Sequence, residues 1–197
     1  MKNVITVIAL LLSAVSLQAS VPGVDRGMAL ERKSKIKNLT YNVFFDIPES
    51  PDSKTGGRTV IGFDYAPVSG DTLEIDFRGD ASQLQSMLVN GRRCEPDYQN
   101  EHILIPDMGL ERGHNEIAIE FTAGTRSLNR RDDFLYTLFV PDRARTTFPV
   151  FDQPDMKRAT LSRLTSLHSG RLWRIVPWLM RHSQVTVSGW FSSPPNS

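Results

Sequence analysis

The sequence predicts an all-β fold, an antiparallel sheet or sandwich followed by an irregular C-terminal tail. Hydrophobic residues alternate with polar ones in several segments, as they do in strands that bury one face. Turn-forming residues separate these segments, and no stretch indicates a helix longer than two or three turns. Short strands joined by such turns favour packed layers of antiparallel sheet, or a saddle-like arrangement of them.

The first three predicted strands follow one another closely. After a short basic segment (residues 30–37), the first strand carries five alternate apolar residues: Leu39, Tyr41, Val43, Phe45 and Ile47. A polar loop (residues 48–57) leads to the second strand, with its alternate residues Thr59, Ile61, Phe63 and Tyr65. The third strand alternates most clearly, with Leu73, Ile75 and Phe77 on one side and Glu74 and Asp76 on the other. Both carboxylates are therefore expected on the solvent face.

The second half of the predicted domain begins with a hairpin. Asn90-Gly91, the strongest short hairpin signal, follows the apolar residues 87–89. Residues 102–105 form a short strand that Pro106 ends, and a turn-rich connection follows. The next strand alternates again, with Ile117, Ile119 and Phe121 opposed to Glu116, Ala118 and Glu120. Residues 134–140 are almost all apolar, which predicts a strand covered on both faces.

Three parts are predicted along the chain. Residues 1–19 are typical of a secretory signal peptide, with a positive Lys2, an apolar run over residues 4–15 and a small Ala19 before the cut. A retained membrane anchor is the alternative, but the run is too short to span a bilayer comfortably. Residues 20–157 form the β-domain, and residues 158–197 form a tail that is expected to be disordered. The protein is thus expected in the periplasm or outside the cell.

Charge and composition change at the start of this tail. Residues 1–155 contain 17 Lys and Arg against 22 Asp and Glu, whereas residues 156–197 contain six basic residues and no acidic one. The Trp- and Arg-rich residues 172–180 suggest contact with an anionic membrane surface. Pro177 interrupts a helix there, however, and the apolar spacing is irregular. Membrane association of the tail is therefore not expected, and no nucleic-acid partner is predicted.

No catalytic residue and no metal ligand is predicted in this chain. None of the four histidines has the i, i+4 spacing that places two zinc ligands on one face of a helix. A glycine-rich phosphate loop and a Gly-x-Ser-x-Gly elbow are also missing from the sequence. The single cysteine, Cys94, forms no intrachain disulfide and lies in the arm of the predicted hairpin. Catalysis by this chain alone is unsupported.

Two pairs of aspartates are candidates for acid–base or calcium-binding groups. They are Asp132 with Asp133, and Asp152 with Asp155. Aspartates beside Phe-Pro or Gln-Pro turns commonly cap their own backbone. Arg143 and Arg145 are also close enough in sequence to pair with these carboxylates. A structural role is the stronger prediction for all four.

The same stretch of sequence carries a family resemblance. Residues 148–154 read FPVFDQP, which resembles the FPCFDEP segment in the N-terminal β-domain of the aminopeptidase N family of zinc metallopeptidases. Residues 38–41, 77–79 and 89–91 are similar to earlier landmarks of that domain, so the resemblance covers roughly residues 27–157. Val150 and Gln153 depart from the pattern. The resemblance implies a packing and turn role for six residues: Phe148, Pro149, Phe151, Asp152, Gln153 and Pro154.

The resemblance implies a non-catalytic domain that shields one side of an active-site cleft. The family's zinc-binding HExxH and substrate-binding GxMEN motifs are absent here, so the chain alone is expected to be inactive and to carry no cofactor. The positions nearest to the family's amine-binding Gln or Glu are apolar (Leu138, Phe139 and Val140). A separate peptidase catalytic domain is the implied partner. The alternative is a stand-alone exported β-sandwich module that binds a peptide or a peptidase.

The tail is predicted to be read in a shifted frame, starting near Lys157. The last base of each codon, taken with the first two bases of the next, permits A-R-Y-T-L-S-L-D-I-P-A from Lys157 onward, similar to the strand with which the family continues. Residues 189–195 permit V-V-Q-F-A-P in the same frame, which is also similar to the family. We therefore expect this chain to be a truncated product of a longer peptidase gene.

Overall fold

The computed structural model describes residues 22–48, 50, 52–66, 68, 70–130, 135–139, 142–156 and 184–187, although not the side chains of residues 130, 135, 136, 138 and 184–187. This part of the chain contains three antiparallel sheets and one α-helix, α1 (Arg26–Lys35). The predicted all-β antiparallel fold is confirmed. The predicted signal peptide lies outside the described residues, as does the predicted tail apart from one strand.

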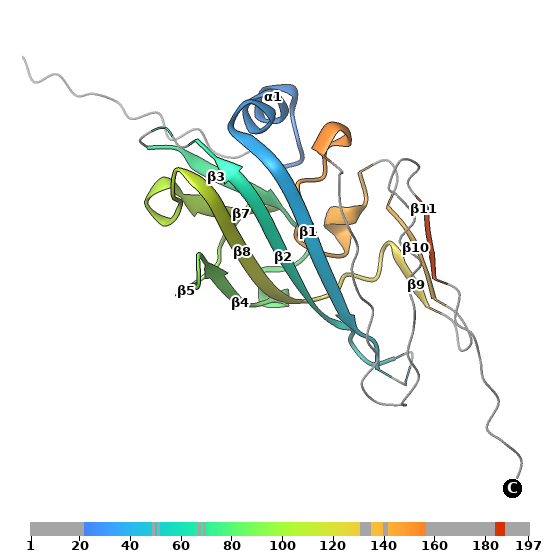
Figure 1. Ribbon diagram of the computed structural model, residues 1–197. Coiled ribbons are helices and arrows are strands. Elements are labelled where there is room, and N and C mark those ends of the chain that lie inside the picture. The colour runs from blue at the N-terminus through green and yellow to red at the C-terminus, as the bar shows by residue number, and fades with distance from the viewer. Residues whose placement is uncertain are drawn as a thin grey trace, which may run out of the picture.

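The largest sheet has five strands, in the order β1-β2-β8-β4-β5. Its strands are β1 (Ile36–Asp46), β2 (Gly56–Tyr65), β8 (Gly113–Thr122), β4 (Leu84–Val89) and β5 (Arg92–Cys94). The long strands β1, β2 and β8 lie side by side, and α1 lies at one end of β1 (Figure 1).

Two smaller sheets complete the fold. One has the order β3-β7-β6 and consists of β3 (Thr72–Asp76), β7 (His102–Pro106) and β6 (Asp97–Gln99). The other has the order β11-β10-β9 and consists of β11 (Gln184–Val187), β10 (Leu135–Leu138) and β9 (Leu128–Arg130). Strand β11 comes from the predicted tail and pairs with β10 along its whole length. In the described part of the chain, four 3₁₀ turns lie between strands: η1 (Ala81–Gln83), η2 (Asp107–Gly109), η3 (Ala144–Thr146) and η4 (Pro154–Met156).

The alternating patterns of the long strands place their apolar residues in the core. Tyr41, Ile61 and Ile117 lie opposite one another across β1, β2 and β8, and all three are buried. The buried cluster also includes residues of β3, β7 and the segment 144–156. Aromatic rings meet edge to face within it, as in the contacts of Phe45 with Phe121 and Phe148, each with ring centroids 6.0 Å apart.

The predicted hairpin is confirmed between β4 and β5. Asn90 and Gly91 form its two-residue loop, with φ angles of 51° and 76°, as a type I′ turn requires. The side chain of Asn90 also accepts a hydrogen bond from the backbone N of Glu116 at 2.9 Å. Cys94 lies at the end of β5, in the hairpin arm where the sequence placed it.

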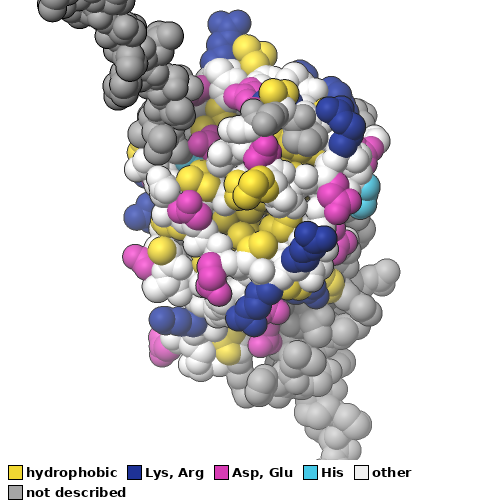
Figure 2. All heavy atoms as spheres, turned by 90° about the vertical axis from the view of Figure 1, so that its left-hand side faces the viewer, with side chains coloured by type: hydrophobic (Ala, Val, Ile, Leu, Met, Phe, Trp, Pro, Cys, Tyr) yellow, Lys and Arg dark blue, Asp and Glu magenta, His cyan; other side chains and the backbone are white. Residues whose placement is uncertain are grey.

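Three large hydrophobic side chains of the described residues are exposed: Leu30, Val68 and Met108. Val68 and Met108 lie on adjacent loops, because the backbone N of Asp107 donates to the carbonyl of Asp71 at 3.0 Å. Figure 2 shows hydrophobic side chains near the middle of the face that it draws, with charged side chains around them. No helix in the described part of the chain is long and apolar enough to cross a membrane.

Candidate functional site

The FPVFDQP segment, residues 148–154, lies in the interior of the fold. Phe148, Pro149, Phe151, Asp152 and Gln153 are buried, and Pro154 is exposed where η4 begins. The segment pairs with the end of β3, because the backbones of Asp76 and Val150 exchange hydrogen bonds of 2.9 and 3.0 Å. Its burial is compatible with the packing and turn role that the resemblance implies, which stays a prediction.

Asp76 is fully buried, which corrects the prediction that its carboxylate faces solvent. Arg32 donates to its Oδ2 from Nη1 at 2.9 Å and to its Oδ1 from Nη2 at 2.6 Å. The backbone N of Asp152 donates to Oδ2 at 2.8 Å, and Nδ1 of His102 lies 3.0 Å from Oδ1. Alternation tells which residues share a face of a strand, but not which distant segments cover that face. Here α1 and the segment 150–152 cover it.

Arg32 reaches this site from α1, which packs over the edge of β3. Asp25 caps the helix by accepting a hydrogen bond from the backbone N of Met28 at 2.8 Å, and basic residues fill its last turn. Arg32 is buried, donates to the carbonyl of Glu74 at 2.7 Å and lies 5.3 Å from the ring centroid of Phe151. The sequence showed only a basic segment here. The Asp25 cap could have revealed the helix, but nothing local marks Arg32 as buried.

His102, the first residue of β7, is also fully buried. Its Nδ1 faces Asp76, and its Nε2 lies 3.1 Å from the carbonyl oxygen of Gly23. The predicted strand over residues 102–105 is thus present, and Glu101 lies in the preceding turn with a φ of 68°. We call Arg32, Asp76, His102 and Asp152 the buried polar cluster. It joins α1, β3, β7 and the FPVFDQP segment.

The cluster holds the Asp76 carboxyl in its charged form. Burial by itself raises the pKa of Asp76, but the hydrogen bond from His102 and the charge and hydrogen bonds of Arg32 outweigh burial and lower it. Tyr41 lies beside the cluster, with its hydroxyl accepting a hydrogen bond from the backbone N of Phe151 at 3.0 Å. Burial raises the pKa of Tyr41 far above its usual range, so this phenol stays neutral.

We expect Asp76 to set part of the acid limit of the fold. Because the pKa of Asp76 is lowered on folding, its stabilisation is present above the ordinary value of about 3.9 and is lost as pH falls through the folded value. Urea unfolding of the wild type and of Asp76→Asn between pH 3 and 7 measures this. The stability difference between the two should shrink below about pH 4, and a difference that is constant with pH would contradict the prediction.

Asp152 and Asp155 have different partners from one another. Oδ2 of Asp152 accepts a hydrogen bond from the backbone N of Arg145 at 3.1 Å. Asp155 pairs with Lys33 at 2.9 Å and accepts from Nε2 of Gln153 at 2.9 Å, and these contacts lower its pKa. The guanidinium of Arg145 instead pairs with Asp142 and Glu101. The pair Asp132 and Asp133 lies outside the described residues.

Gln153 occupies the position where the family pattern has Glu. It is buried, and its Nε2 donates to the carbonyl of Ala29 at 3.1 Å as well as to Asp155. We expect Gln153→Glu to lower the free energy of unfolding by about 2 kcal/mol or more, because an ionised carboxylate has no proton to donate to these two acceptors. Urea unfolding measures the change. Gln153→Met, which adds no charge, is the control and should lower the free energy of unfolding by less than Gln153→Glu does. If Gln153→Glu were as stable as the wild type, the prediction would be wrong.

The described residues do not fit a zinc ion. No three His, Cys, Asp or Glu side chains gather among them as metal ligands would. Asp76 and His102 are neighbours, but the guanidinium of Arg32 already binds both carboxylate oxygens. The cavity between α1 and β3 has a volume of about 20 Å³, the size of one water molecule.

The apolar positions near the family's amine-binding residue are only partly described. Phe139 is buried, and its ring centroid lies 5.4 Å from that of Phe148. Val140 and the side chain of Leu138 lie outside the described part of the chain. Phe139 therefore belongs to the core, and no amine-binding group is assigned.

Solved structures of zinc metallopeptidases share this fold. The M1 zinc metallopeptidase of Deinococcus radiodurans superposes with a TM-score of 0.54 and 15% identity over 79% of this chain and 38% of that chain. Native yeast LTA4 hydrolase gives a TM-score of 0.54 and 14% identity over 73% of this chain and 24% of that one. Yeast LTA4 hydrolase in complex with bestatin gives a TM-score of 0.53 and 13% identity over 78% of this chain and 28% of that one.

The likeness lies in the fold and not in overall sequence. The sequence matches no protein-family model, and no curated protein is significantly similar to it. The chain spans well under half the length of the peptidase structures that it matches. The resemblance to the zinc aminopeptidases is thus confirmed at the level of the fold: the described chain has the β-rich fold of the N-terminal region of M1 zinc metallopeptidases.

Proposed function

We propose that this chain is a non-catalytic β-domain of a zinc-aminopeptidase-like protein, which packs beside a peptidase catalytic domain and has no peptidase activity alone. The observation that carries the proposal is the superposition of 79% of the chain on only 38% of the D. radiodurans M1 zinc metallopeptidase. A chain that matches one region of a larger enzyme is expected to perform the task of that region.

The FPVFDQP segment supports the same proposal. Its aromatic residues are in the core, and Asp152 and Gln153 hydrogen-bond to β3 and α1. In our proposal the segment shapes the domain and takes no part in chemistry. The zinc would be bound by the catalytic domain, through an HExxH helix that presents two histidines on one face. We further propose that the domain is exported.

We further propose that the reading frame shifts near Lys157, and restoring the frame is the decisive experiment. Removing the shift by one base near codon 157 should extend the protein into a zinc domain and give aminopeptidase activity that a chelator abolishes. The chain as it stands, assayed with added zinc on the same aminoacyl p-nitroanilides, is the control and should release no product. Absence of an HExxH-encoding frame downstream would refute the frame hypothesis. Zinc-dependent activity of the 197-residue chain itself would refute the proposed function.

A further inference from the structure

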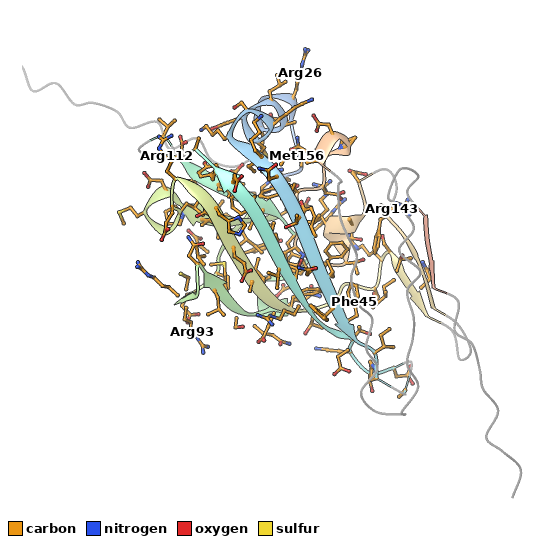
Figure 3. The ribbon with its side chains drawn as sticks, in the orientation of Figure 1. Arg26, Phe45, Arg93, Arg112, Arg143 and Met156 are labelled. Atoms are coloured by element: carbon orange, nitrogen blue, oxygen red, sulfur yellow. The ribbon has the colours of Figure 1, made fainter. Side chains whose placement is uncertain are left out.

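Residues 22–35 form a strap that covers the edge of β3. In the sheet order β3-β7-β6, the described strands give β3 a partner on one side only, apart from its bridge to Val150. On the open side, Arg32 donates to the carbonyl of Glu74, as a neighbouring strand would. Figure 3 shows that Arg26, the first residue of α1, points away from the body of the domain. The strap thus holds the body through its buried side.

The strap is fastened at a second point, where Gly23 meets His102. Nε2 of His102 lies 3.1 Å from the carbonyl oxygen of Gly23, and Nδ1 lies 3.0 Å from Oδ1 of Asp76. Both neighbours are hydrogen-bond acceptors. A neutral imidazole has one N–H, whereas the imidazolium has two. Only the imidazolium donates to Gly23 and Asp76 at the same time.

The charges around His102 also favour the imidazolium. Asp76 from β3 and Asp152 from the FPVFDQP segment contribute two buried carboxylates, and Arg32 from α1 contributes one buried cation. Arg145 from η3 is a further buried cation, and its guanidinium pairs with Asp142 and Glu101, while Glu101 also pairs with Arg78. A protonated His102 therefore makes the buried polar cluster electrically neutral, which lowers the cost of burying it.

We propose that His102 is held as an imidazolium that latches the strap, so that strap closure takes up a proton and the latch loosens as pH rises. A free imidazole is mostly neutral above about pH 6.5. Opening the strap above that pH releases one proton, and the opening equilibrium rises by up to about tenfold per pH unit. On the acid side, protonation of Asp76 removes the other half of the latch.

The first test determines the state of His102 in the unmodified chain. Nitrogen-15 NMR at pH 7.5 distinguishes an imidazolium, in which both ring nitrogens carry protons, from either neutral tautomer. We expect the imidazolium pattern for His102. A neutral tautomer at this pH overturns the proposal, and the measurement requires no substitution that could disturb the fold.

The second test follows the strap by hydrogen exchange of the α1 amides between pH 6.5 and 8.5, corrected for the intrinsic exchange rate. Protection should fall by up to about tenfold per pH unit in the wild type and be independent of pH in His102→Gln. His114→Gln is the matched control, because His114 lies 3.4 Å from Asp64 but is 71% exposed; it should behave as wild type. Protection that does not change with pH in the wild type overturns the latch even if His102 is charged.

Discussion

Arg32→Met is expected to lower the free energy of unfolding by about 3–5 kcal/mol, because it leaves the buried Asp76 carboxylate without its main counter-ion. Arg32 is 4% exposed and makes two hydrogen bonds to Asp76 and one to the carbonyl of Glu74. A loss of this size approaches the whole stability of an ordinary domain. Urea or thermal unfolding of the purified variant measures it.

Lys33→Met is the matched control, since it removes one cation from the same helix. Lys33 is 62% exposed and its partner Asp155 is 42% exposed, so the expected loss is below about 1 kcal/mol. Adding Asp76→Asn to Arg32→Met should recover part of the stability, because the carboxylate that lost its partner is then neutral. Equal losses of stability in Arg32→Met and Lys33→Met would show that the buried cation contributes no more to stability than the exposed one.

Phe151→Ala is expected to lower the free energy of unfolding by about 3–5 kcal/mol, because it leaves a cavity in the core. Phe151 is fully buried, and its ring meets that of Phe63 edge to face at a centroid distance of 6.1 Å. The guanidinium of Arg32 also loses the ring beneath it. The change therefore weakens both the apolar and the polar contacts of the FPVFDQP segment. Chemical denaturation gives the size of the loss.

Phe44→Ala is the control for this prediction. Phe44 lies on β1 on the face opposite to the core residues Val43 and Phe45, and it is only half-buried. Its truncation should cost about 1 kcal/mol, as for other partly exposed side chains. A Phe151→Ala variant as stable as Phe44→Ala would mean that the segment is not the packing element that the family resemblance implies.

Much of the fold could be predicted because it depends on local pattern. The alternation of residues 39–47 and 59–65 places Tyr41 and Ile61 in the core, since neighbouring side chains of a strand point to opposite faces. Asn90-Gly91 also specifies its hairpin locally, because both residues tolerate a positive φ. The FPVFDQP motif pointed to a fold that the comparisons with solved structures bear out.

The sequence by itself determined the fold class, the positions of the main strands along the chain and the kind of protein that the chain resembles. Only the tertiary structure decided that Arg32, Asp76 and His102, separated by 44 and 26 positions, meet in the core. The physical reason is that hydrophobic periodicity records which face of a strand is covered, whereas the burial of a charge depends on partners from distant segments. Asp76 has the alternation of a surface residue, and its environment is set by α1, β7 and the FPVFDQP segment.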